Sequence, residues 1–212
     1  MEREVDRPAR FNLAGALEQA WVQYRANLWR VFPFAVLTVL PPLGFLHSIA
    51  TGVVLVLLFE GWAIMMLTEA TRLSGREENP ALVPHMFHRA GGHIKNGTVI
   101  VLFVLLLLVV GFVPLVIPSI FFYSLFIFSF CHAAVRNKFA IDACMESFRS
   151  GRGNRLPLFL VAAFLYLAMA AFYTAAYLLF DGAGWAAAVP AAFFLPYYAM
   201  VIEELFEQWE AL

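Results

Sequence analysis

The sequence predicts an all-α membrane protein, a polytopic helical bundle, and three observations lead to that class. Of its 212 residues, 62% are hydrophobic and only 14% are charged, against about 45 to 50% apolar and about 25% charged in soluble domains. The apolar residues form runs close to the roughly 20 residues that a helix needs to cross a bilayer. The basic residues gather between these runs and not within the short turns. We therefore do not expect a soluble globular domain.

Six apolar runs predict six membrane spans. Within each successive pair, the two runs are joined by a short turn rich in proline or glycine, such as Pro41 to Gly44 or Asp181 to Gly184. Turns of this kind join antiparallel neighbours. We therefore expect three helical hairpins, with one re-entrant segment in the third or fourth run as the alternative. The expected spans cover residues 29–46, 49–70, 97–113, 119–135, 156–180 and 185–206.

A longer polar segment precedes each expected hairpin. Apolar side chains recur in it at steps of three or four residues, as Trp21, Tyr24 and Leu28 do in the first segment. This period is typical of an amphipathic helix, which can lie at a membrane surface. We expect such interfacial helices at about residues 11–28, 80–94 and 138–149. Together with the spans they make one integral membrane domain over residues 1–212.

The position of the positive charge predicts the orientation of the chain. All 14 basic residues belong to the N-terminal segment or the two long connections, and none lies in a short turn or in the C-terminal tail. By the positive-inside rule, both termini are expected in the cytoplasm. Cys131 and Cys144 are then expected to be free thiols on the reducing side. A net charge of −1 argues against a nucleic-acid partner, and the mixed-charge start does not resemble a cleavable signal peptide.

Glu60 is the one carboxylate well inside an expected span. At 1.5 Å per residue it lies about 16 Å from the start of that span, near the middle of an apolar core about 30 Å thick. A charge at this depth costs several kcal/mol, so we expect the side chain to be protonated, paired or facing a wet cavity. The functional hypothesis is a proton or cation site. The alternative is a neutral glutamic acid that is hydrogen-bonded to a neighbouring span.

The other candidate residues lie on the expected cytoplasmic side. Arg149, Arg152 and Arg155 place three positive charges beside an amphipathic helix, which suits an anionic lipid surface. Trp21 and Tyr24, on the first interfacial helix, are candidates for a surface that meets lipid headgroups or a partner. The alternative for the arginines is that their charge only sets the topology.

No catalytic or metal centre is predicted. The sequence lacks the motifs of serine hydrolases, zinc proteases, P-loop proteins and dinucleotide-binding proteins. His85, His88 and His93 lie close in sequence but have no nearby residues that would complete a metal site. His132 could ligate a haem only with an opposing partner that the sequence does not indicate. We therefore expect no enzymatic activity, no cofactor and no bound metal.

Part of the sequence resembles a known group of proteins. Residues 117–122 (IPSIFF), followed by a span and then by residues 141–148 (IDACMESF) and Gly153-Asn154, resemble a pattern of uncharacterised bacterial six-span membrane proteins. These are similar to the membrane domain attached to some glycerophosphodiester phosphodiesterases and to the YciC-like inner-membrane proteins. Ser119 and Asp142 replace the glycine and glutamate that are usual in the pattern. The resemblance implies a six-span fold and a bacterial inner membrane, but no phosphodiesterase activity, because that domain is not present.

These observations predict a non-enzymatic inner-membrane protein. The leading hypothesis is an accessory or scaffold subunit that organises a larger membrane complex or its lipids. Its expected partners are membrane lipids and other membrane protein subunits, or further copies of the chain itself. The alternative is a small transporter or channel that uses the intramembrane carboxylate of Glu60.

Overall fold

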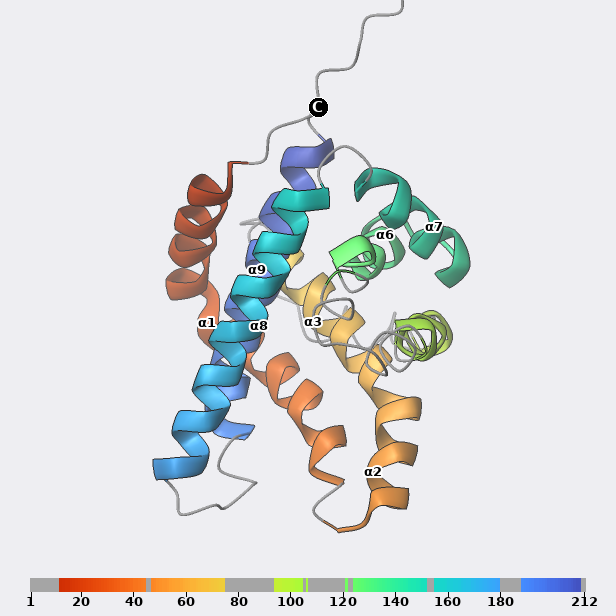
Figure 1. The fold of residues 1–212 in the computed structure, drawn as a ribbon, viewed down its shortest axis with the longest axis vertical. Coiled ribbons are helices and arrows are strands. Elements are labelled where there is room, and N and C mark those ends of the chain that lie inside the picture. Colours follow the sequence, from red (N-terminus) through yellow and green to blue (C-terminus); the bar gives the residue numbers. More distant parts are fainter. Residues whose placement is uncertain are drawn as a thin grey trace, which may run out of the picture.

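The computed structural model describes residues 12–44, 47–74, 94–104, 106, 121, 124–151, 155–179 and 188–210, and all regular structure in these ranges is helical. Figure 1 shows the arrangement of the helices. Three helices in the described ranges are long and apolar enough to cross a membrane, and they cover Leu13–Leu43, Ala50–Ser74 and Ala188–Glu210. The chain is therefore an all-helical protein that is embedded in a membrane.

The first long helix, α1 (Leu13–Leu43), contains both the first expected interfacial helix and most of the first expected span. It begins at Asn12, whose side chain accepts a hydrogen bond from the Gly15 N–H at 3.0 Å and so caps the helix. Pro33 lies inside the helix, where it removes one backbone hydrogen bond and favours a bend. The two halves of α1 run in different directions in Figure 1. The first expected interfacial helix and the first expected span are thus joined by a bend and not by a loop.

The second long helix changes its hydrogen-bonding pattern part of the way along. It begins after Ser48, whose hydroxyl accepts a hydrogen bond from the Thr51 N–H at 3.0 Å. A π-helical turn, which holds one residue more than an α-helical turn, separates two α-helical parts that meet at an angle in Figure 1. Glu60 is the last residue of that turn. The three parts are α2 (Ile49–Leu55), η2 (Val56–Glu60) and α3 (Gly61–Ser74).

Four further helices lie in the described part of the C-terminal half. They are α6 (Ser129–Val135), α7 (Ala140–Ser150), α8 (Arg155–Leu179) and α9 (Ala188–Glu210). α9 packs along α1 and α3, and α8 packs against α9. The start of α1 is tied to the end of α9, because the Asn12 N–H donates to Gln208 Oε1 at 3.0 Å. Both of these helix ends lie at the same end of the bundle in Figure 1.

The fourth expected span, 119–135, is not one uninterrupted helix where the structure describes it. Residues 126–128 form a turn before α6. The Ser147 hydroxyl of α7 bonds the backbone beside this turn, accepting from the Phe128 N–H at 3.2 Å and donating to the Leu125 carbonyl at 3.0 Å. Irregular backbone at membrane depth is tolerated where protein groups satisfy it. The turn therefore depends on α7, which packs against α6.

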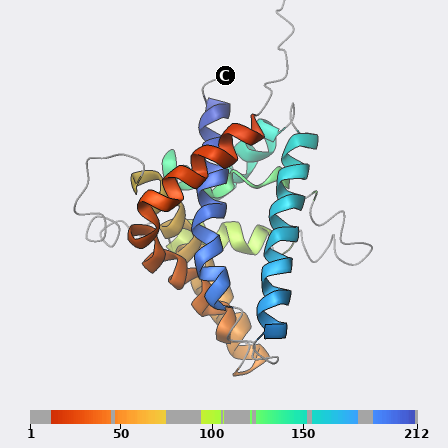
Figure 2. The same ribbon diagram turned by 90° about the vertical axis from the view of Figure 1, so that its left-hand side faces the viewer.

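A short apolar helix, Ile94–Val104, covers the start of the third expected span. It runs across the bundle and not along it, as the pale green helix in Figure 2 shows. This orientation differs from that of a regular span, which would run along the bundle. Residues 80–93 of the second expected interfacial helix, and residues 107–113 of the third expected span, lie outside the described residues.

Two glycines let this transverse helix, Ile94–Val104, touch the second long helix backbone to backbone. A Cβ atom placed on Gly61 would lie 2.0 Å from the Gly97 carbonyl oxygen, and one placed on Gly97 would lie 2.3 Å from the Gly61 carbonyl group. Both separations are far below van der Waals contact. Small residues allow such close approach between helices in membrane proteins. Only glycine at both positions is compatible with this crossing.

The Gly61→Ala variant should destabilise the protein. The added methyl group would force the two backbones apart, and overpacking of this kind costs about 1 to 3 kcal/mol of unfolding free energy. Thermal unfolding in mild detergent is the measurement. Gly151→Ala is the matched control, because a Cβ there would meet only Leu158 Cδ1 at an ordinary 3.4 Å. Equal melting temperatures for the two variants would contradict the close crossing.

Candidate functional site: a cavity at Glu60

The helical bundle contains a cavity of about 340 Å³, and Glu60 forms part of its wall. The wall is built from α1, η2, α3, the transverse helix, α6 and the segment before it, α8 and α9. The volume falls at the lower end of the range of about 300 to 1,000 Å³ that is usual for small-molecule sites. Segments far apart in sequence thus converge on one partly open cavity.

Helical periodicity explains why Glu60 faces this cavity. Val56, Glu60 and Ile64 line the wall at steps of four, and Leu67 and Thr68 follow Ile64 by three and four residues, which places all five on one face of the helix. Glu60 therefore points into the bundle and not toward the lipid.

The transverse helix and α9 supply the facing walls with the same periodicity. Val101 and Val104 follow Gly97 by four and seven residues, so they lie on the face that touches α3. The contact at Gly97 therefore brings them to the cavity. From α9 the wall includes Leu195, Tyr198, Ala199 and Ile202, again on one helical face.

The carboxyl group of Glu60 is the dominant polar feature of the wall. No other carboxylate and no basic side chain is present among the described wall residues. Its Oε2 atom is buried and has no hydrogen-bond partner in the described part of the chain. A buried polar atom in this state costs about 1 to 3 kcal/mol, so it calls for a proton, a water or a ligand group. The cavity is the space in which such a partner would lie.

Two threonine hydroxyls add hydrogen-bonding capacity. Thr38 Oγ1 donates to the Ala35 carbonyl at 2.7 Å, and Thr68 Oγ1 donates to the Ile64 carbonyl at 2.9 Å. Because a hydroxyl oxygen also carries two lone pairs, each can still accept a hydrogen bond from a ligand. Together with the Glu60 carboxyl group, these hydroxyls suit a ligand that donates hydrogen bonds or carries a positive charge.

The residues that share the cavity with Glu60 were not predicted from the sequence. Thr68 could have been found, because it lies eight residues after Glu60 and so on the same helical face. Thr38, Phe130 and Tyr198 come from other helices. Their proximity to Glu60 depends on how the helices pack, and no local pattern indicates it.

The predicted surface residues Trp21 and Tyr24 lie away from the cavity, on the side of α1 that packs against α9. Their rings stack with centroids 5.6 Å apart, and both meet Tyr197 edge-on, at 6.0 and 5.9 Å. The Arg25 guanidinium lies 5.7 Å from the centre of the Trp21 ring. Tyr24 is half-buried in this contact, whereas Trp21 keeps 48% of its surface exposed. The cluster joins two helices and leaves one aromatic side chain at the surface.

Of the three predicted basic residues, Arg149 and Arg155 are exposed, and Arg152 lies outside the described residues. The Arg155 guanidinium lies 5.7 Å from the centre of the Phe148 ring, a cation–π contact. Neither arginine lines the cavity at Glu60. Glu60 and the predicted surface arginines therefore lie at different sites in the structure.

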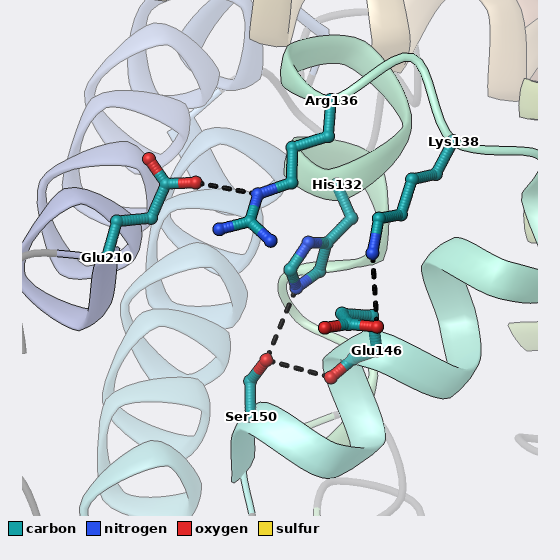
Figure 3. A network of polar contacts seen from close by, with 6 residues as sticks. All are labelled: His132, Arg136, Lys138, Glu146, Ser150 and Glu210. Carbon is teal, nitrogen blue, oxygen red and sulfur yellow. Dashed lines mark hydrogen bonds and ion pairs between the residues drawn. The ribbon is translucent and has the colours of Figure 1, made fainter.

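His132 is placed by contacts within the protein. Its Nε2 lies 3.3 Å from Ser150 Oγ, and that hydroxyl donates its proton to the Glu146 carbonyl at 2.8 Å (Figure 3). Since the hydroxyl proton is already used, Nε2 must carry the proton of the His132 ring. The ring also packs edge-on against Phe206 and Trp209, at 4.9 and 5.4 Å. These contacts give His132 a structural role in joining α6, α7 and α9.

Two ion pairs surround this histidine. The Arg136 Nε donates to Glu210 Oε1 of α9 at 2.9 Å, and the Lys138 Nζ lies 3.1 Å from Glu146 Oε2 of α7 (Figure 3). The Lys138 ammonium, which donates a hydrogen bond to the carboxylate, lowers the pKa of Glu146 below its ordinary value of 4.5. The two ion pairs hold the segment between α6 and α7 to α9 and to α7.

The predicted cysteine state is confirmed, since Cys131 and Cys144 are free and buried. Burial raises the pKa of the Cys144 thiol and makes it a poor nucleophile. Among the described ranges no group of three His, Cys, Asp or Glu side chains could hold a metal ion. His85, His88 and His93 lie outside those ranges.

Comparison of the chain with family models, with curated proteins and with solved structures gives no match. The resemblance of residues 117–122 and 141–148 to six-span bacterial proteins therefore stays a prediction. A shared fold would in any case leave the activity open, because function depends on the site. The cavity at Glu60 and the chemistry of its wall are the basis for a functional proposal.

The ion pair between Glu146 and Lys138 should make stability depend on pH. A carboxylate with a lowered pKa stabilises the folded state above its ordinary pKa of 4.5, and this contribution is lost as the pH falls through the lowered value. The Glu146→Gln variant should therefore melt slightly below the wild type at pH 7, and the difference should disappear in acid. Glu18→Gln, an exposed change on α1, is the control. A difference that persists at acidic pH would contradict the assignment.

Proposed function

We propose that the chain is a small, non-enzymatic transporter of the bacterial inner membrane, with the cavity at Glu60 as its substrate site. The observation that supports this proposal is the buried, unpartnered Oε2 of Glu60 in the cavity wall. Ionisable groups inside membrane helices typically mark ion or substrate pathways. Substrate sites of transporters also lie near the middle of the membrane, beside interrupted helices, and Glu60 ends the π-helical turn η2.

The composition of the wall supports transport over catalysis. Among its described residues, Glu60 is the one carboxylic acid, and it is accompanied by the Cys131 thiol, by hydroxyls and by apolar side chains. General acid–base and nucleophilic catalysis require a second group that is positioned to activate or orient the first. We therefore keep the proposal non-enzymatic.

The topology proposed here has an even number of spans with both termini in the cytoplasm, and Ile94–Val104 lies across the bundle where a third regular span was expected to begin (Figure 2). The distribution of basic residues supports this orientation. The start of α1 and the end of α9 lie at the same end of the bundle in Figure 1, as an even number of spans requires. The cationic ends of Arg25, Lys95, Arg136 and Arg155 each lie over an aromatic ring, which suits residues at a membrane interface.

A transporter must open its site to each side of the membrane in turn. In a Thr38→Cys variant, the new thiol would lie in the cavity wall. A small membrane-impermeant methanethiosulfonate reagent should then modify position 38 both in right-side-out and in inside-out vesicles. Peptide mass spectrometry identifies the modified cysteine.

The native Cys144 provides a matched internal control for this experiment. It is buried in α7 and does not line the cavity, so it should remain unmodified from both sides. Modification of position 38 from neither side, or from only one, would count against a transporter. Global unfolding would instead expose Cys144, which separates a damaged protein from an open one.

The second candidate function is an accessory or scaffold subunit, and the outer face of α7 favours it. Ile141 and Met145 of this helix are 60% and 50% exposed, and the adjoining Phe139 is 45% exposed. The opposite face is buried through Ala143, Cys144 and Ser147. An amphipathic helix that presents apolar side chains outward can lie on lipid or on a partner subunit.

Mild-detergent purification at native expression discriminates the scaffold from the transporter. A scaffold should co-elute with a defined second membrane protein, which mass spectrometry would identify. An Ile141→Asn, Met145→Asn double variant should lose that partner, while Leu178→Asn, an exposed apolar change on α8, should retain it. Recovery of the chain alone as a monomer would exclude the scaffold function.

A further inference from the structure

We infer that the ligand of the Glu60 cavity is a small lipophilic organic cation, with an ammonium group on an apolar body. This inference rests on the proposed function and narrows it to a class of substrate. Three features of the wall carry it: its charge, its aromatic residues and the apolar character of the remainder.

The charge of the wall selects for a cation. Glu60 is the only charged side chain among the described wall residues, and no basic side chain balances it. An anion would meet an unbalanced carboxylate. A hydrated inorganic cation would need several oxygen ligands to replace its water, whereas the wall offers one carboxylate and a few hydroxyls. An organic ammonium needs fewer contacts of this kind, because most of its surface is already apolar.

The aromatic residues suit the same ligand. Phe130 from α6 and Tyr198 from α9 line the cavity together with Glu60 from η2. The faces of aromatic rings attract ammonium groups, and quaternary ammonium ligands in particular are bound by combinations of rings and a carboxylate. The three side chains come from three different elements, so they can surround a cationic group from more than one direction.

The remaining wall determines the body of the ligand. It is lined by aliphatic side chains that include Val101, Val104, Ile127 and Leu195, which favour an apolar group. The volume of about 340 Å³ limits the ligand to a size near the lower end of the usual range. A neutral apolar molecule of that size would fit, but it would leave the buried Glu60 Oε2 without a partner.

Binding to the full chain in phosphatidylcholine nanodiscs tests the inference. Isothermal titration calorimetry would compare three probes of similar shape: benzyltrimethylammonium, its neutral carbon isostere neopentylbenzene, and the anion phenylmethanesulfonate. The cation should bind at least about tenfold more tightly than the neutral isostere, since only the cation gains charge-assisted and cation–π contacts. The anion should not bind measurably.

Variants assign the effect to the cavity. Glu60→Gln keeps the shape of the side chain and should weaken binding of the cation at least about tenfold, with little change for the neutral isostere. Glu18→Gln, an exposed change on α1, should leave both affinities unchanged. If the Glu60 variant fails to fold, Phe130→Leu serves in its place, and it should weaken binding of the cation more than that of the isostere.

The outcomes separate this inference from the proposed function. Equal binding of the cation and the isostere, or a cation affinity that Glu60→Gln leaves unchanged, would overturn the inference. Should position 38 still be modified from both sides in that case, the transporter would stand with a different substrate class. Conversely, the cation could bind in a Glu60-dependent way while position 38 is modified from one side only. That result would support the proposed ligand and contradict the transporter function.

Discussion

The backbone contact between Gly61 and Gly97 is the constraint on which the cavity depends. It places the transverse helix directly against the junction of η2 and α3, because a side chain at either position would occupy the space of the other backbone. Val101 and Val104 then close one wall of the cavity, and Glu60, next to Gly61 in the chain, is held at the same junction. The position of the carboxylate and the shape of the space in front of it therefore have one common cause.

Regular helix is also interrupted in α1 and before α6. Pro33 bends α1, which packs against α9 and α3 along its length. The turn at residues 126–128 is bonded by the Ser147 hydroxyl from α7. In a membrane the bonds from Ser147 are necessary, since lipid offers no hydrogen bonds to freed backbone groups. The polar contacts of His132, Arg136 and Lys138 then join α7 and α9 to α6, one of the elements that lines the cavity.

The sequence was sufficient for the fold class and for the intramembrane carboxylate. Composition and long apolar runs predict membrane helices because burial in lipid requires both, and Glu60 is conspicuous as an acid within such a run. The bend in α1, the π-helical turn and the transverse helix were not predicted, because packing between distant segments decides them. The same holds for Tyr198 and Phe130, which reach Glu60 only through tertiary contacts. Thr68 is the exception, since its helical spacing from Glu60 was available in the sequence.

The π-helical turn also changes how the faces of the second long helix must be assigned. Val54 and Leu58 belong to an exposed stripe on α2 and η2. Continued at the α-helical period, that stripe would pass through Gly61 and Met65, yet both of these residues are buried. The exposed stripe therefore ends at η2, whereas the cavity-lining positions Val56, Glu60 and Ile64 continue across the turn at steps of four. Beyond Glu60, α1, α6 and α9 pack around α3, so exposure on the first part of this helix does not predict exposure on the second.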